Sequence, residues 1–189
     1  MRTFQQALSA AFERLGAIGN GLALIETATE ERDEGWVFYH QGEDYLATGD
    51  FSSMLVGNAP LFVPRDGATP AIISYHRSVD ESMAAYRFCG DPNAAPNAEV
   101  VLSGWKIGAS KVSATQTIRS ATSLGLSEAK QTVDACLNGH AVPIGTASVD
   151  GARALVSTLA SLGFIAEISY GERQVFCMPD IGSPLATGA

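Results

Sequence analysis

The side chains that could do chemistry are few in this chain and widely spaced. The histidines are single, and a lone histidine such as His40, beside the aromatic residues of a predicted strand, is more often structural than catalytic. The sequence contains no HExxH, GxSxG, GxxxxGK[ST] or CxxC motif, and its cysteines fit no zinc spacing. The other two histidines are His76 and His140, and the three cysteines are Cys89, Cys136 and Cys177. We therefore expect no catalytic residue, no metal site and no cofactor.

Two further features of the sequence support this expectation. The adjacent carboxylates Glu43 and Asp44 could serve acid–base chemistry, but neighbouring acids in a charged segment are usually only solvated.

Three cysteines that form no disulfide framework indicate small buried hydrophobic residues in a reducing compartment. The N-terminal stretch MRTFQQALSAAFERLGAIG is too polar for the apolar part of a signal peptide. We therefore expect a cytoplasmic protein.

The negative charge of the chain is concentrated in one segment. The net charge is −8, and residues 26–50 hold eight acidic residues against Arg32 alone, which is a net −7. A field of this sign repels nucleic acid and anionic membranes, and it speeds encounter with a basic protein. The alternative is a solvated acidic loop that only aids solubility. The expected partner is thus a protein, with no nucleic acid and no membrane.

The stretch YLATGDFSSMLVGNAPLFV, residues 45–63, follows this acidic segment. Thr48 or Asp50 could cap a short helix, and Gly57 with Asn58 would end it through left-handed backbone. Pro60 would then start the strand LFV. The short helix is expected to turn three apolar side chains toward the core: Phe51, Met54 and Leu55.

The pattern of apolar residues divides the chain into two blocks of α+β type. In residues 1–89 we expect a helix that ends at Gly16 and Gly19, strands over 22–27 and 35–41, a hairpin over 60–76, and a helix over 78–88. Ser78 and Glu81 fit a capping box at the start of that last helix. The first helix should bury one face: Phe4, Leu8, Phe12 and Leu15. Alternation in the second strand should place Trp36, Phe38 and His40 on one face and Val37 and Tyr39 on the other. The expected architecture is an antiparallel sheet with flanking helices.

The segment GDPNAAPN, residues 90–97, is predicted to be a linker because its prolines and turn residues disfavour helix and strand. A second domain over 98–171 should have the order β-α-α-β-α-β, with strands over 99–107, 141–146 and 164–170 and helices over 111–122, 127–139 and 148–163. The first of these helices should bury Val112, Thr115, Ile118 and Ala121 or Thr122. Ser127 and Ser148 are the expected N-caps of the other two, Gly139 and Gly163 their stops, and Leu155, Leu159 and Leu162 the inward face of the last. Residues 178–189 are predicted to be a flexible tail.

The first block resembles the immunity protein 35 family, also called the YrhB domain. The likeness covers about residues 1–88 and rests on a Gly-Trp pair on an aromatic strand, a Thr-Gly-Asp turn and a Gly-Asn-x-Pro turn. These structural motif residues are Trp36, Gly49, Gly57, Asn58 and Pro60, together with Gly35, Tyr45, Leu46, Thr48, Asp50 and the Asp66-Gly67 turn. The resemblance implies a bacterial cytoplasmic protein, often encoded beside polymorphic toxins, that binds and neutralises a toxin. Some members are viewed as stress-related or chaperone-like.

The second block resembles the C-terminal domain of the bacterial ribosomal stalk protein through the run KVSATQTIRSATSLGLSEAKQTV. In the stalk protein this helical hairpin docks translation GTPases through basic residues. Lys111, Arg119 and Lys130 keep three of those positions, so the resemblance implies that they are partner-binding candidates.

The hypothesis from the sequence is therefore a non-enzymatic immunity protein that occludes a cognate toxin with a basic surface. The candidate toxin-binding residues are Tyr39 and the acids around it: Glu30, Glu31, Asp33, Glu34, Glu43, Asp44 and Asp50. Trp36 is expected in the core. The alternatives are a chaperone-like stress protein and a regulator that contacts translation factors through the second block. The sequence does not indicate an oligomeric state.

Overall fold

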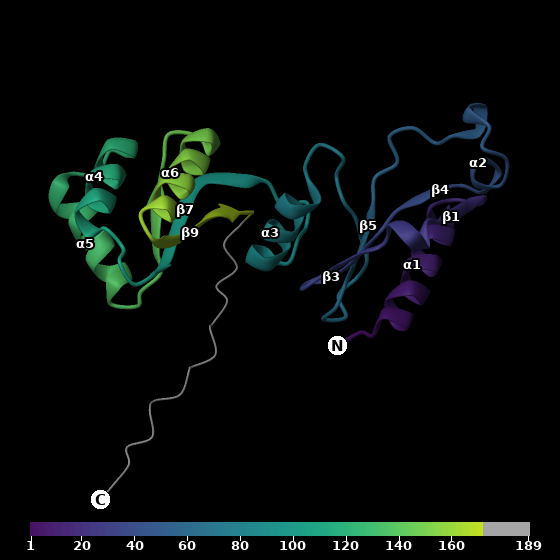
Figure 1. Cartoon of the computed structure of the whole chain (residues 1–189), viewed down its shortest axis with the longest axis horizontal. Coiled ribbons are helices and arrows are strands. Elements are labelled where there is room, and N and C mark those ends of the chain that lie inside the picture. The colour runs from purple at the N-terminus through teal and green to yellow at the C-terminus, as the bar shows by residue number, and fades with distance from the viewer. Residues whose placement is uncertain (172–189) are drawn as a thin grey trace, which may run out of the picture.

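The computed structural model describes residues 1–171, in two halves that lie side by side along the long axis of the molecule (Figure 1). The predicted tail 178–189 and Cys177 lie outside the described residues. The helices of the first half are α1 (Phe4–Ile18), η1 (Glu26–Ala28), α2 (Glu43–Thr48), η2 (Phe51–Ser53) and α3 (Val79–Cys89). Its strands are β1 (Leu22–Leu24), β2 (Glu30–Arg32), β3 (Gly35–Phe38), β4 (His40–Gly42), β5 (Leu61–Pro64) and β6 (Ala71–Ile72). Across residues 1–171, the helices are too short or too polar to cross a bilayer.

The main sheet of the first half has the strand order β2-β3-β5-β6, and every neighbouring pair is antiparallel. The predicted hairpin is confirmed as β5 and β6. The aromatic run predicted as one strand is divided at Tyr39, and β4 pairs instead with β1 in a second, two-stranded sheet. The prediction of a single strand over 35–41 is therefore wrong.

Both faces of the main sheet are buried, and the alternation predicted for Trp36, Val37 and Phe38 is confirmed. Trp36 and Phe38 pack against α1, whereas Val37 packs with Ile73 and Met83 on the side of α3. Trp36 is only 2% exposed, which confirms its place in the core. The sheet thus lies between α1 and α3.

The buried face of α1 is only partly the predicted one: Leu15 is buried and Leu8 packs against the same core, but Phe4 and Phe12 are exposed. Ala7, Ala11 and Leu15 contact the sheet, while Phe4 and Phe12 are 40% and 49% exposed. Small alanine side chains let the helix lie close to the strands, where two phenylalanines would not fit. Phe4 instead meets the rings of Trp36 and Phe38 at the helix end, each with a centroid separation of 6.3 Å. Gly16 lies inside α1, and only Gly19 caps it.

The second half consists of β7 (Pro96–Trp105), α4 (Lys111–Ala121), α5 (Leu126–Leu137), β8 (Val142–Gly145), α6 (Val149–Ser161) and β9 (Phe164–Tyr170). Its antiparallel sheet has the order β8-β7-β9, and Val100 and Leu102 of β7 are buried in a cluster with the three helices. The predicted element order and the α+β class are confirmed.

Some details of these helices differ from the predictions. Val112 is 69% exposed, and Ala114 takes its place in the core beside Thr115 and Ile118. The N-cap of α5 is Gly125 and not Ser127. The Glu128 carboxylate stabilises this helix start by accepting a hydrogen bond from the Gly125 amide at 2.8 Å. The predicted N-cap of α6 is confirmed, since the Ser148 hydroxyl accepts from the Gly151 amide. In α6, Leu155 and Leu159 are buried as predicted, whereas Leu162 is the half-buried C-cap.

The segment predicted as a linker is short and ordered. Pro96 is the first residue of β7, a position where a missing amide hydrogen is tolerated, so the prediction that 90–97 excludes strand is wrong at its end. The Asn93 side chain donates to the Ile72 carbonyl at 2.7 Å and accepts from the Ser74 amide at 2.8 Å. These bonds hold the connection against the first half.

Helix α3 packs against both halves. Its inner face contacts the main sheet, while Ala85 and Phe88 pack against Tyr170 of β9, with the rings of Phe88 and Tyr170 6.2 Å apart. The Glu81 backbone amide donates a hydrogen bond to the Ser78 hydroxyl at 3.1 Å, and the Glu81 carboxylate pairs with Arg153 of α6. The second arm of the predicted capping box is therefore replaced by an ion pair between the halves.

Candidate partner-binding surface

The acids of β2 are engaged by side chains of β2 itself and of more distant parts of the sequence. The Glu30 carboxylate accepts hydrogen bonds from the Tyr39 hydroxyl at 2.7 Å and from Arg32 Nε at 3.2 Å. Arg32 also donates to Asp80 of α3 at 2.9 Å. The bond from Tyr39, followed by that from Arg32, lowers the pKa of Glu30. Burial and the bond to Glu30 raise the pKa of Tyr39 to about 12, so its hydroxyl stays protonated and engaged.

Glu31 and Glu34 are also paired with arginines. Arg65 donates to Glu31 at 2.8 Å, and its guanidinium lies 4.2 Å from the centre of the Trp36 ring. Glu34 pairs with Arg87 of α3, and the Glu34 side chain is only 8% exposed. Asp33 itself is exposed. Three arginines thus offset much of the negative charge that the sequence places here.

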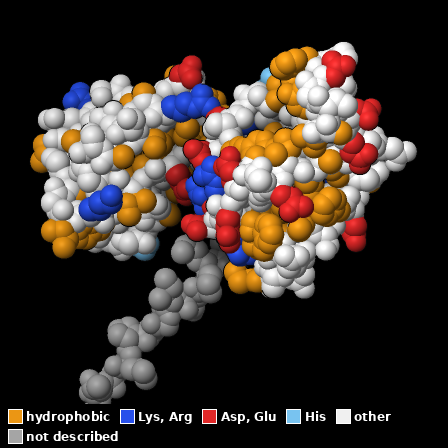
Figure 2. All heavy atoms as spheres, turned by 45° about the vertical axis from the view of Figure 1, so that its right-hand side comes forward, with side chains coloured by type: hydrophobic (Ala, Val, Ile, Leu, Met, Phe, Trp, Pro, Cys, Tyr) orange, Lys and Arg blue, Asp and Glu red, His pale blue; other side chains and the backbone are white. Residues whose placement is uncertain are grey.

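Several of these paired residues line a hollow of about 350 Å³ between β2, the β2–β3 turn and α3. Figure 2 shows the blue and red side chains gathered where the two halves meet. The residues that line the hollow are Glu31, Arg32, Asp33, Glu34, Asp80, Met83 and Arg87. With acids and arginines interleaved, this face has no strong preference for a partner of one sign.

The other three acidic candidates lie elsewhere, around α2. Glu43 and Asp44 are exposed in the first turn of this helix, where negative charge is favoured by the helix dipole. Asp50 caps η2 by accepting from the Ser52 amide and hydroxyl, which lowers the pKa of its carboxylate. Within residues 1–171, none of these three acids is in an ion pair. The acidic candidates therefore divide into a paired group and an unpaired group.

Large apolar side chains are exposed beside the unpaired acids. Phe51 is 76% exposed and Val56 84%, so the prediction that Phe51 points to the core is wrong, and Leu55 at 38% is only partly covered. Leu46 of α2 is 45% exposed. Phe51 rests on the half-buried ring of Tyr45, with a centroid separation of 6.1 Å. In Figure 2 apolar and acidic side chains lie together at the upper right, the end of the molecule where Figure 1 places α2.

Two side chains hold this segment in place, Gln41 and Asn58, and only Asn58 was predicted to be structural. The amide oxygen of buried Gln41 accepts from the Leu55 amide at 2.7 Å, and its nitrogen donates to the Leu55 carbonyl at 3.1 Å. Asn58 donates to the His40 carbonyl. Gly49 and Gly57 take left-handed backbone, as expected for turn positions. The only sign in the sequence that Gln41 has a structural role is that it is a polar residue at the end of an apolar strand. The sequence does not indicate that its side chain binds the backbone of Leu55.

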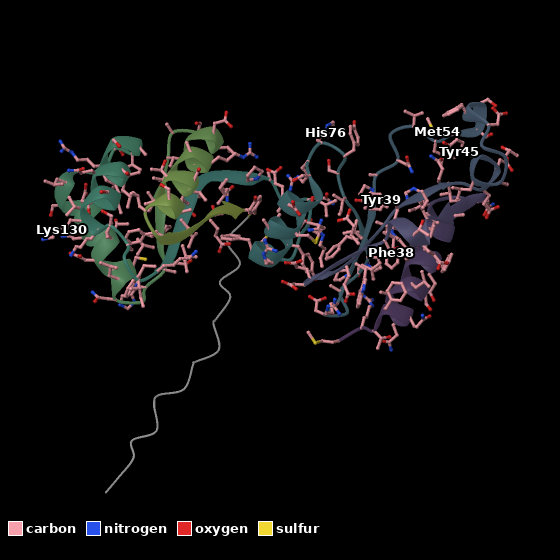
Figure 3. The ribbon with its side chains drawn as sticks, in the orientation of Figure 1. Phe38, Tyr39, Tyr45, Met54, His76 and Lys130 are labelled. Carbon is pink, nitrogen blue, oxygen red and sulfur yellow. The ribbon has the colours of Figure 1, made fainter. Side chains whose placement is uncertain are left out.

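The basic candidates of the second half are far from all these residues. Lys111 pairs with Asp134 of α5, whereas Arg119 and Lys130 are exposed on α4 and α5. Figure 3 shows Lys130 at one end of the molecule and Tyr45 and Met54 at the other. The structure therefore does not join the acidic and basic candidates into one surface.

Within residues 1–171, no three His, Cys, Asp or Glu side chains are grouped closely enough to hold a metal ion. His40 is 7% exposed, and burial lowers its pKa. Burial likewise raises the pKa of the Cys136 thiol, which disfavours the reactive thiolate.

The comparison with protein families identifies the first half. The family model for immunity protein 35 matches residues 5–107, more than half of the chain. The chain belongs to the immunity protein 35 family. No curated protein and no solved structure matches it. The match confirms the resemblance seen in the sequence and extends it beyond residue 88, through the connection that follows α3 and through β7.

Membership of the immunity protein 35 family implies a toxin as the partner. Immunity proteins of this kind are generally not enzymes. The matched residues include the paired acids of β2 and the β2–β3 turn as well as the α2 segment, and they end before α4. The resemblance of the second half to the ribosomal stalk protein has no support from these comparisons.

Proposed function

We propose that this protein is a cytoplasmic immunity protein that binds a cognate bacterial toxin, encoded beside it, and neutralises the toxin by covering its functional surface. The immunity protein 35 match over residues 5–107 is the observation that carries the proposal. Inhibition is steric and electrostatic, because binding alone can block an active site without any chemistry by the inhibitor. The toxin is a secreted effector or a polymorphic toxin with a basic surface.

The test is protection of cells. The product of the gene immediately upstream is induced in bacteria with and without this chain, and a pull-down with the purified chain measures complex formation. We expect growth to be restored only when the chain is co-expressed. Failure to protect, together with no complex, would overturn the proposal. Suppression of aggregation across unrelated client proteins without such protection would favour the chaperone-like alternative.

A second candidate function concerns the second half alone. Arg119 and Lys130 are exposed on neighbouring helices, the arrangement that a regulator contacting acidic translation factors needs. Charge reversal at Arg119, Lys130 and Lys111 should then abolish capture of a translation GTPase. Unchanged capture of every partner by this variant would exclude the candidate.

A further inference from the structure

The exposed apolar residues around α2 form a compact surface with the unpaired acids. We define the α2 surface by its apolar residues Leu46, Phe51, Leu55 and Val56 and by its acids Glu43, Asp44 and Asp50. We propose that the toxin docks on the α2 surface, through a complementary face that is apolar at its centre and basic around it. This proposal rests on the proposed function and specifies where the toxin binds.

The apolar residues of the α2 surface are unusually concentrated. Fourteen large hydrophobic residues are exposed among those described, and four of them fall within residues 46–56. Single exposed hydrophobic residues are ordinary, but a contiguous patch rimmed by polar side chains is typical of a protein–protein interface. Phe51 and Val56 would each lose most of their contact with water in a complex, which is the property of an anchor residue.

The α2 surface is also held in one conformation before any partner arrives. Gln41 bonds both backbone groups of Leu55, Asn58 bonds the His40 carbonyl, and Asp50 caps η2. The buried amide of Gln41 has its acceptor and one donor satisfied by this segment, so moving the segment away would leave a buried polar group without partners. A segment that is already ordered loses little entropy on binding.

Charge decides the kind of partner. The acids of β2 and the β2–β3 turn are offset by Arg32, Arg65 and Arg87, whereas Glu43, Asp44 and Asp50 are in no ion pair within residues 1–171. The field that remains at the α2 surface is therefore negative. A basic partner gains both steering and specificity from it. A second copy of this chain fits poorly, because a two-fold contact would bring the same three acids against each other.

The test uses the full chain and the purified product of the upstream gene, with affinity and rates measured by surface plasmon resonance. Phe51→Ser combined with Val56→Ser should weaken binding by about 30-fold or more, the loss typical of a hot spot. Val112→Ser, at a residue that is 69% exposed on α4, is the matched control and should change binding little. Because all three residues are exposed, the folded state should survive, and circular dichroism checks this.

A second variant tests the charge on its own. Glu43→Gln with Asp44→Asn should slow association by about tenfold at low salt and reduce the dependence of the rate on salt. Glu13→Gln with Glu26→Gln removes the same charge from exposed positions outside the α2 surface and should have a smaller effect. The charge variant also keeps the proposal testable if the apolar variant does not fold.

The outcomes separate this proposal from the proposed function. If the unchanged chain binds the toxin and both α2 variants bind equally well, the docking site is wrong while the immunity function stands. If the unchanged chain neither binds nor protects, the proposed function fails. If sedimentation shows a dimer that Phe51→Ser with Val56→Ser dissociates, the α2 surface is a self-association surface and the proposal is overturned.

Discussion

Arg32, Arg65 and Arg87 change what the acidic segment can do. Each guanidinium contacts a carboxylate of Glu30, Glu31 or Glu34, and two of these arginines lie 34 and 53 residues beyond their partners in the sequence. The pairs of Arg32 with Glu30 and of Arg65 with Glu31 are partly exposed, so each adds little stability. Their main effect is on the electrostatic field, because they leave the acids around α2 as the strongest unpaired negative charge among the candidates.

His40 predicts how the stability of the protein depends on pH. Because burial lowers its pKa, the folded chain holds His40 neutral in a range where the unfolded chain takes up a proton. The contribution of His40 to the free energy of unfolding should therefore be at its maximum above about pH 6.5 and decrease as the pH falls below that value. For this one proton the decrease is at most about 1.4 kcal/mol per pH unit. Urea unfolding of the full chain at pH 7.5 and pH 5.5 measures the difference.

The comparison that isolates His40 uses two variants. His40→Gln should reduce the loss between pH 7.5 and pH 5.5, although its stability at pH 7.5 will also be lower. His140→Gln, at an exposed residue, should keep the loss seen in the unchanged chain. The same pH dependence in the unchanged chain and in His40→Gln would show that His40 is not its source.

At the scale of elements, the pairing of β3 with β5 explains the Gly-Trp pair of the family pattern. Trp36 fills the core beneath α1, and Gly35 lets the two strands approach closely. A Cβ atom at residue 35 would lie 2.2 Å from the carbonyl oxygen of Val63. The glycine is therefore required by its neighbour in the sheet, and the tryptophan by the core.

Two glycine substitutions should have opposite effects on stability. Gly35→Ala forces β3 and β5 apart and should lower the free energy of unfolding by about 1–3 kcal/mol. A Cβ atom at residue 16, inside α1, would have no other atom within 4 Å, so Gly16→Ala should raise the free energy of unfolding by about 0.5–1 kcal/mol. Denaturant unfolding of both variants measures the signs. Equal stability of Gly35→Ala and the unchanged chain would contradict the close approach of the strands.

At the scale of the whole molecule, the family match and the fold do not end at the same place. The match stops at residue 107, after β7, yet β7 is the central strand of a sheet whose other strands are β8 and β9. Val100 and Leu102 of β7 are fully buried by elements that follow the matched region. The matched segment therefore depends on residues 108–171 to cover one of its strands.

A shortened chain tests this dependence. Residues 1–107 alone would expose Val100 and Leu102 and remove the contact of α3 with Tyr170, so this chain should aggregate or bind a dye for exposed apolar surface. Residues 1–171 keep every described element and should unfold cooperatively at a similar denaturant concentration to the full chain. A cooperative, monomeric 1–107 chain would show that the first half needs no support from the second.

The sequence by itself determined the α+β class, most helices and strands, the core position of Trp36, the Ser148 cap and the immunity protein 35 family. Those features depend on local periodicity, capping chemistry and turn residues, which act over a few positions. Only the tertiary structure decided that alanines face the sheet in α1, that α3 joins the two halves, and that Phe51 is exposed. It also separated paired acids from unpaired ones, because that separation is made by arginines distant along the chain and brought near by folding.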